Sequence, residues 1–214
     1  MPLPTPMLEA QDLAAERGQA RLFRGVAFRI EPGCALAVTG SNGSGKTTLL
    51  RILAGLSAPA AGSVRLAGIP VKPFDPRLRE AIAFGGHLPA LKDELTALEN
   101  LESLTALAGT RVTHSALREA LDRVALSQRQ ALPARVLSQG QRRRIGLARL
   151  RVLRKPLWIL DEPATALDRE GNALFASMLA EHLDGGGAAV VATHQPIDLP
   201  PARVSALAID ACAS

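Results

Sequence analysis

The sequence predicts an α/β fold with a parallel sheet, because short apolar runs typical of buried strands alternate with helical segments along much of the chain. Polar residues follow several of these runs directly, as they do at the carboxyl edge of a parallel sheet. The clearest case is the apolar run Cys34–Val38, which a glycine-rich loop joins to a helix predicted at Thr48–Leu53. This order of strand, loop and helix supports the α/β assignment.

Residues 40–48 fit G-x-x-x-x-G-K-[ST], the phosphate-binding loop motif. The glycines let the backbone approach oxygen atoms closely, and the N-terminus of the following helix adds partial positive charge. Lys46 is expected to reach the β- and γ-phosphates, and the Thr47 hydroxyl to bind Mg²⁺. The residues predicted to hold the nucleotide phosphates are Gly40, Ser41, Asn42, Gly43, Ser44, Gly45, Lys46, Thr47 and Thr48.

The first third of the chain also predicts a small antiparallel sheet beside the loop. Met7–Leu13 is predicted as an edge strand and Leu22–Ile30 as a second strand, with a turn at Gly18–Gln19 between them. Ser63–Gly68 is predicted as another short strand with its turn. The apolar residues of Leu78–Phe84 predict one more strand.

Residues 87–137 predict a helical subdomain inserted into a single domain that spans residues 1–214. Thr96 and Glu99 form a capping box, so a helix begins there. Leucines recur every three residues along this helix, which predicts contacts on more than one of its sides. They are Leu95, Leu98, Leu101, Leu104 and Leu107. A second amphipathic helix is predicted at His114–Val124.

The catalytic core is expected to comprise residues 1–86 and 138–214. In its second part a helix is predicted from Ser138 to Leu153, and Pro156 stops it. Strands and helices then alternate. They are a strand at Leu157–Leu160, a helix at Arg169–Leu183, a strand at Ala188–Ala192 and a last strand at Val204–Ile209.

The composition favours a reduced, cytosolic protein. Cys34 and Cys212 are far apart in sequence, residues 1–6 lack the pattern of a signal peptide, and no apolar run approaches the roughly 20 residues of a membrane span. The net charge is +5. The basic run Arg142–Arg144, with three further arginines to Arg154, scatters around a helix at 100° per residue, so we expect a solvated, partly paired helix rather than a nucleic-acid site.

Two carboxylates follow the predicted strand Leu157–Leu160. Asp161 would lie at the carboxyl edge of the sheet beside the phosphate loop and is predicted to hold Mg²⁺. Glu162 is the next residue and is predicted to polarise an attacking water as a general base. A phosphate loop and an acidic strand end together predict hydrolysis of a nucleotide.

The segment Leu137-Ser138-Gln139-Gly140-Gln141 resembles L-S-x-G-Q, the signature motif of the ATP-binding cassette family. The resemblance implies a phosphate-loop NTPase core with a RecA-like parallel sheet, ATP as the nucleotide and Mg²⁺ as its metal. It also implies a head-to-tail dimer with a second copy of the chain. In that dimer Ser138 and the N–H of Gly140 would cap the γ-phosphate held by Lys46 of the other copy.

Further motifs follow in the family's order. Ala166–Asp168 is similar to the D-loop, which touches the partner copy, and His194 to the switch histidine, which senses the γ-phosphate. Arg17 stands where the family usually has an aromatic residue stacked on adenine, and either it, Phe23 or neither serves that purpose. No glutamine stands at the Q-loop position, where His87 is expected to contact Mg²⁺ or water and to relay motion to the membrane subunit.

Segments around residues 87–101, 157–163 and 193–196 resemble one subfamily, the ATP-binding subunit of the haem exporter in cytochrome c maturation. Leu88 and Ala164 depart from its usual pattern. The resemblance implies an ATPase at the cytoplasmic face of the inner membrane, powering permease subunits on separate chains, with no nucleic-acid partner.

Other functions remain as alternatives. The chain could serve another ABC exporter. A soluble cassette ATPase acting on nucleic acid or ribosomes usually carries two cassettes or long coiled-coil insertions, and neither is present. A non-catalytic regulatory module would be expected to lack Lys46, Glu162 or His194, and all three are present.

Overall fold

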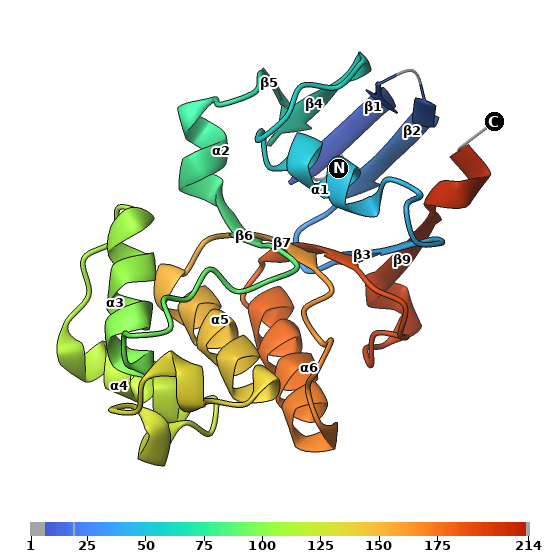
Figure 1. Cartoon of the computed structure of the whole chain (residues 1–214). Helices are drawn as coiled ribbons and strands as arrows, with labels where there is room; N and C mark the ends of the chain where they lie inside the picture. The colour runs from blue at the N-terminus through green and yellow to red at the C-terminus, as the bar shows by residue number, and fades with distance from the viewer. Residues whose placement is uncertain (1–6, 19, 213–214) are drawn as a thin grey trace. The chain divides into compact units, whose positions relative to one another are not determined.

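The computed structural model describes residues 7–18 and 20–212, and within them the strands form two sheets (Figure 1). The antiparallel sheet has the order β2-β1-β4-β5, and the second sheet has the order β6-β7-β8-β3-β9. The strands are β1 (Leu8–Arg17), β2 (Ala20–Ile30), β3 (Ala35–Thr39), β4 (Ala61–Leu66), β5 (Ile69–Val71), β6 (Ile82–Gly85), β7 (Leu157–Asp161), β8 (Ala188–Ala192) and β9 (Val204–Ala208). The predicted α/β class is confirmed.

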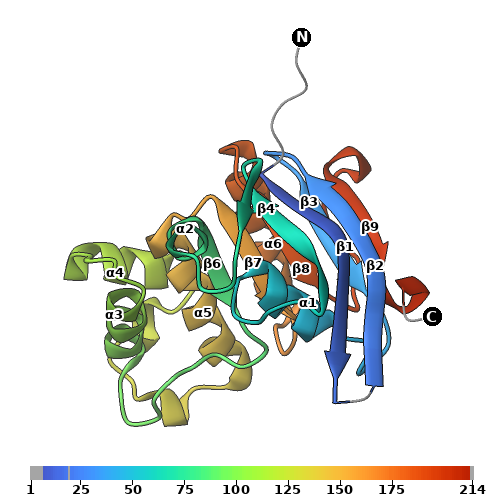
Figure 2. The same ribbon diagram turned by 90° about the horizontal axis from the view of Figure 1, so that it is seen from above.

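Strand β1 lies inside the antiparallel sheet, where it pairs with β2 on one side and β4 on the other (Figure 2). The prediction of an edge strand at Met7–Leu13 is therefore wrong. The side chains of Leu8, Leu13 and Val26, which belong to this sheet, are buried. Local alternation of apolar residues reports burial on one face, and it carries no information on the number of strand neighbours. Of the predicted turn, Gln19 lies outside the described residues.

Parallel pairing joins four strands of the second sheet. β3 pairs in parallel with β8 and with β9, and β7 pairs in parallel with β8. All residues of β7 and β8 are buried, as expected where both faces of a parallel sheet are covered. Helix α1 (Lys46–Leu53) contacts β7 and β8 as well as β1, so it packs between the two sheets.

The strand predicted at Leu78–Phe84 is replaced by a helix followed by a shorter strand. Helix α2 (Pro76–Ala81) occupies the first half, and β6 begins at Ile82. Asp75 caps the helix by accepting the N–H of Arg77, and Pro76 stands in its first turn, where a missing N–H costs nothing. The apolar residues of this segment favoured a strand in the sequence analysis, although Asp75 and Pro76 are typical of a helix start.

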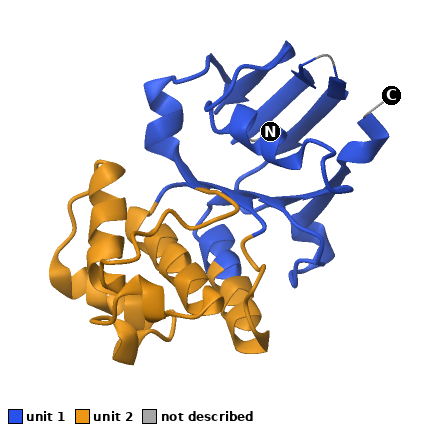
Figure 3. Ribbon diagram, viewed as in Figure 1, with its two compact units in different colours: residues 1–84, 155–162, 179–214 blue, residues 85–154, 163–178 orange. Residues whose placement is uncertain are grey.

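The chain divides into two compact units (Figure 3). Unit 1 comprises residues 1–84, 155–162 and 179–214 and contains the sheets and the phosphate loop. Unit 2 comprises residues 85–154 and 163–178. Its helices α3 (Ala97–Leu107), α4 (His114–Asp122) and α5 (Gln139–Leu153) pack on one another, and helix α6 (Arg169–Asp184) continues from unit 2 into unit 1.

Helix α3 begins with the predicted capping box. The Thr96 hydroxyl accepts the N–H of Glu99, and the Glu99 carboxylate accepts the N–H of Thr96. Leu98 and Leu101 are buried, but the side chain of Leu107 is 77% exposed. Helix α3 contacts both α4 and α5, in agreement with the prediction of contacts on more than one side, and Leu107 at its C-terminal end is exposed.

The leucines of α3 give a test of this packing. Leu101→Ala should lower the free energy of unfolding by about 2–5 kcal/mol, because it removes a fully buried side chain and leaves a cavity. The matched change Leu107→Ala should stay within about 0.5 kcal/mol. Denaturant unfolding of both variants measures the difference, and equal losses would contradict the placement of α3.

Candidate nucleotide-binding site

The phosphate loop follows β3 and ends where α1 begins at Lys46. Gly45 caps the helix at a φ of 100°, in the left-handed region that favours glycine. A Cβ at this position would lie 3.0 Å from Cδ1 of Phe23 and 3.2 Å from Cβ of Leu22. Strand β2 therefore packs directly behind the loop, and the motif's second glycine is required by both backbone conformation and space.

The side chain of Lys46 folds back over the loop and is largely buried. Its ammonium group donates to the carbonyl of Gly40 at 2.8 Å and to that of Ser41 at 2.9 Å. The hydroxyl oxygen of Ser44 is also buried, and it has no hydrogen-bond partner among the described residues. A buried hydroxyl beside a lysine and a helix N-terminus fits an anionic phosphate group.

Asp161 and Thr47 meet as the sequence predicted for a magnesium site. Thr47 donates its hydroxyl to Oδ2 of Asp161 at 2.8 Å, and Asp161, the last residue of β7, is 2% exposed. No group of three or more His, Cys, Asp or Glu side chains that could hold a metal occurs in the described part of the chain. One hydroxyl and one carboxylate fit Mg²⁺, which takes few protein ligands and relies on phosphates and water for the rest.

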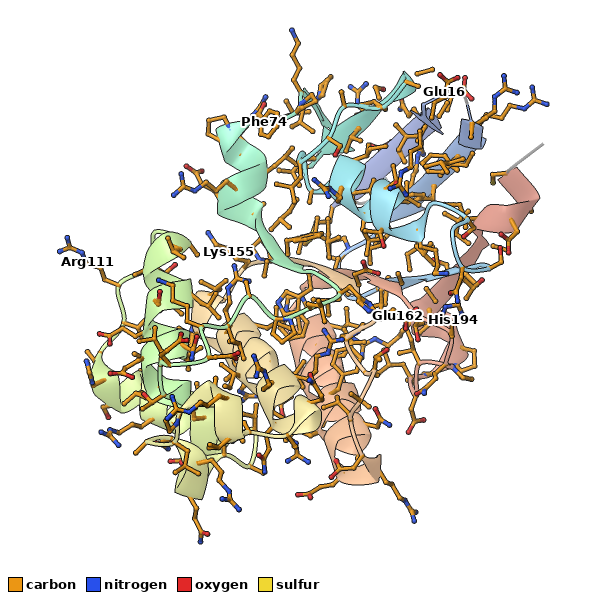
Figure 4. The ribbon with its side chains drawn as sticks, viewed as in Figure 1. Glu16, Phe74, Arg111, Lys155, Glu162 and His194 are labelled. Carbon is orange, nitrogen blue, oxygen red and sulfur yellow. The ribbon has the colours of Figure 1, made fainter. Side chains whose placement is uncertain are left out.

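Glu162 and His194 approach each other at the same edge of the sheet (Figure 4). Nε2 of His194 lies 3.3 Å from Oε1 of Glu162. Parallel pairing explains this, because Asp161 is in register with Ala192, so the residues that follow β7 and β8 emerge together. Glu162 has a φ of 51°, a strained conformation for a side chain of this kind, and its N–H donates to the carbonyl of Ala192.

The signature segment Leu137–Gln141 forms the start of α5 in unit 2. The Ser138 hydroxyl accepts the N–H of Gln141, and the Gln141 side chain accepts the N–H of Ser138, which makes a capping box. A Cβ on Gly140 would lie 2.9 Å from the carbonyl oxygen of Ala166, in the predicted D-loop. Glycine in the signature is thus required by the close approach of that loop.

The basic residues of α5 contact other segments of unit 2. Arg142 pairs with Asp93, Arg143 donates to the carbonyl of Thr165 at 3.4 Å, and Arg144 pairs with Asp168 at 2.9 Å. Arg143 and Arg144 are buried. The prediction of pairing is confirmed for these residues, but the prediction of solvation is wrong for the two buried ones, because their guanidinium groups reach carbonyls and carboxylates of neighbouring segments.

Asp168 holds the start of α6. Its carboxylate accepts the N–H of Gly171 at 2.8 Å in addition to the Arg144 guanidinium. These interactions lower the pKa of Asp168, the Gly171 N–H first and Arg144 second. The carboxylate therefore stays ionised at neutral pH and fixes the turn that follows the predicted D-loop.

The residues expected to contact the base and to replace the Q-loop glutamine differ in their accessibility. Phe23 is completely buried, so the alternative in which it stacks on adenine is wrong. Arg17 is exposed at the end of β1, opposite Ala20. His87 is exposed and belongs to unit 2.

Sequence reasoning missed Asp210, which contacts the phosphate loop through Ser41. It lies in the turn η4 (Ile209–Cys212), directly after β9. The signal that identified Asp161, an acidic residue just after a strand of the parallel sheet, was present here too.

A phosphate loop, an acidic strand end that meets its threonine and a glutamate–histidine pair define a nucleotide hydrolase of the phosphate-loop class. A family model described as ABC transporter matches residues 23–165. The chain belongs to the ABC transporter family. The predicted family is thereby confirmed.

Curated relatives of the chain belong to one group within the ABC transporter family. The cytochrome c biogenesis ATP-binding export protein CcmA of Aromatoleum aromaticum is 48% identical over 92% of this chain and 94% of the relative. The protein of that name from Pseudomonas aeruginosa is 48% identical over 90% of this chain and 95% of the relative. Among the described residues, no helix has the length and apolar character that crossing a membrane requires.

Solved structures of ATP-binding cassettes share the fold. A dimeric structure of MJ0796, a bacterial ABC transporter cassette, has a TM-score of 0.81 at 25% identity and covers 95% of each chain. A dimeric post-hydrolysis state of the same cassette, bound to ADP and Pi, has a TM-score of 0.78 at 26% identity and covers 88% of each chain.

The buried hydroxyl of Ser44 predicts opposite effects on stability and binding. Ser44→Ala should leave the melting temperature unchanged or raise it, because the hydroxyl has no hydrogen bond to lose among the residues that the structure describes. Its KM for ATP should rise about tenfold or more, because a hydrogen bond to a charged phosphate is lost.

The exposed Ser63→Ala in β4 serves as the control and should change neither quantity. A Ser44→Ala protein with the wild-type KM would exclude the hydroxyl from the phosphate site.

Proposed function

We propose that the chain is the ATP-hydrolysing subunit of the haem exporter complex of cytochrome c maturation, and that it powers permease subunits on separate chains. The observation that carries the proposal is a hydrolytic site complete in Lys46, Asp161, Glu162 and His194, in a chain 48% identical to cytochrome c biogenesis export ATPases over nearly its whole length. The relatives' name supports the pathway, and the site supports the activity.

Lys46 and the N–H groups of the phosphate loop would bind the β- and γ-phosphates of ATP. The lysine already lies over the loop on the carbonyls of Gly40 and Ser41, so its charge is positioned for the phosphate oxygens. Thr47 and Asp161 would hold Mg²⁺, which when bound neutralises charge on the phosphates. Arg17 is proposed to stack its guanidinium on the adenine.

Glu162 would take a proton from the water that attacks the γ-phosphate. His194, 3.3 Å from the glutamate, orients that carboxylate and senses the γ-phosphate. The strained φ of Glu162 and its N–H bond to Ala192 fix the direction of the side chain before ATP binds. A general base placed in this way contributes about 10²–10⁴ in rate.

A second copy of the chain would complete the site. We propose a head-to-tail dimer in which Ser138 and the N–H of Gly140 at the start of α5 bind the γ-phosphate held by the other copy. A capped helix N-terminus offers the positive end of a dipole to an anion. Solved structures of a cassette with the same fold are dimeric, which supports the pairing of two copies.

The permease would lie in the inner membrane, with this subunit on its cytoplasmic face. His87 is proposed to contact Mg²⁺ or water and to relay the closure of the dimer to the permease. Haem, or an adduct of haem with a chaperone, is the proposed cargo.

Replacing the general base separates binding from hydrolysis. Glu162→Gln should lower kcat at least about 100-fold, because the amide cannot accept the proton of the attacking water. ATP should then accumulate in a dimer, which light scattering with and without ATP would detect. Near wild-type hydrolysis by this variant would show that Glu162 is not the base.

The same variant identifies the permease. Glu162→Gln protein used as bait on detergent-solubilised membranes should retain the membrane subunits of cytochrome c maturation when ATP is present, and Lys46→Ala bait should not. Recovery of a different permease would move the chain to another ABC exporter, and recovery of ribosomes would support a soluble ATPase.

A further inference from the structure

The carboxylate of Asp210 contacts Ser41, the second residue of the phosphate loop, with both of its oxygens. Oδ2 accepts the backbone N–H of Ser41 at 2.8 Å, and Oδ1 accepts the Ser41 hydroxyl at 2.9 Å. These residues are 169 positions apart in sequence. Paired hydrogen bonds to an ionised acceptor fix orientation as well as distance.

Parallel register explains why these distant residues meet. β9 pairs with β3 so that Ala208 lies opposite Thr39, the last residue before the loop. The next residues of the two strands therefore run side by side, and Asp210 arrives opposite Ser41. The fully buried Ile209 anchors the turn, which packs against β2 and β3.

The fit between the two segments is tight at Gly40. A Cβ there would lie 2.6 Å from Cγ2 of Ile209 and 3.3 Å from Oδ2 of Asp210. Because Gly40 has no Cβ, the turn that contains Asp210 can pack closely against the loop. The position of the carboxylate is set by buried packing on one side and by the loop backbone on the other.

The contact also extends to Lys46. The carbonyl of Ser41, whose N–H and hydroxyl are held by Asp210, accepts the Lys46 ammonium at 2.9 Å. The pKa of Asp210 is lowered, first by the Ser41 N–H, then by the Ser41 hydroxyl, with a further contribution from the charge of Lys46. The group is therefore a carboxylate at neutral pH and acts only as an acceptor.

We propose that Asp210 is a positioning residue for ATP binding: by holding the N–H and hydroxyl of Ser41, it fixes the first turn of the phosphate loop and the carbonyl on which Lys46 rests. Asp210 would not contact ATP itself. It would affect phosphate binding through its hydrogen bonds to Ser41 and through the position of Lys46. The inference rests on the proposed function, because it concerns the same ATP site.

Two substitutions separate the hydrogen bonds from the charge. Asp210→Ala removes both and should raise the KM and the equilibrium Kd for ATP about five- to tenfold, with kcat within about twofold. Asp210→Asn removes the charge but keeps an acceptor for the Ser41 N–H and a donor for its hydroxyl, so it should keep KM within about twofold of wild type. Asp198→Ala removes an exposed carboxylate elsewhere and should change neither constant.

Each other outcome overturns the proposal. An unchanged KM in Asp210→Ala would show that the contact does not position the loop. Equal losses in the alanine and asparagine variants would assign the effect to charge. Tighter ATP binding by either variant would show that the negative charge of Asp210 weakens the binding of the ATP phosphates.

A double-mutant cycle tests the coupling of Asp210 to Ser41, and its Ser41→Ala variant keeps the proposal testable where Asp210→Ala proves unstable. Ser41→Ala removes only the hydroxyl bond and should raise KM about two- to threefold, and it should add nothing in the Asp210→Ala background. Full additivity would contradict the coupling. Equilibrium ATP binding is measured alongside hydrolysis, so a wild-type chain that binds ATP without hydrolysing it would overturn the proposed function and leave the Asp210 test standing.

Discussion

Parallel pairing of β7, β8, β3 and β9 is the constraint on which the site depends. Their carboxyl ends meet at one edge, so residues that follow four separate strands arrive together. Asp161 meets the hydroxyl of Thr47, Glu162 meets His194, and Asp210 meets Ser41. A slip of one strand by one residue would turn its functional side chain to the opposite face and separate these pairs.

The sequence was sufficient for features that are encoded locally. The glycine-rich loop, the capping box at Thr96, the helix start at Ser138, and the apolar runs of β7 and β8 each lie within a few residues, and the structure contains all of them. The acidic residues after β7 could be placed at the sheet edge because strand direction follows from the alternation of strands and helices. Helix α2 could also have been found from Asp75 and Pro76, had its start signal been weighed against its apolar residues.

Features that depend on distant neighbours could not be predicted. Phe23 packs against the phosphate loop, and the leucine spacing of α3 does not reveal that Leu107 is exposed. The arginines of α5 look like a solvated basic run because their partners, such as Asp93 and Asp168, lie outside the helix. Asp210 could have been placed at the sheet edge from its position after a predicted strand, but its contact with Ser41 depends on the register between β9 and β3.

Ser138 in the signature segment caps α5, and in the proposed dimer the same side chain would contact the ATP of the partner copy. Its hydroxyl oxygen accepts the Gln141 N–H and so stabilises the start of α5. A hydroxyl has one donor in addition to two acceptor positions, so this cap leaves its hydrogen compatible with a phosphate oxygen. The cap also holds the side chain at the helix N-terminus, where the dipole favours an anion. The same bond that begins the helix therefore orients the group that a second copy's γ-phosphate would meet, and an alanine there would lose both.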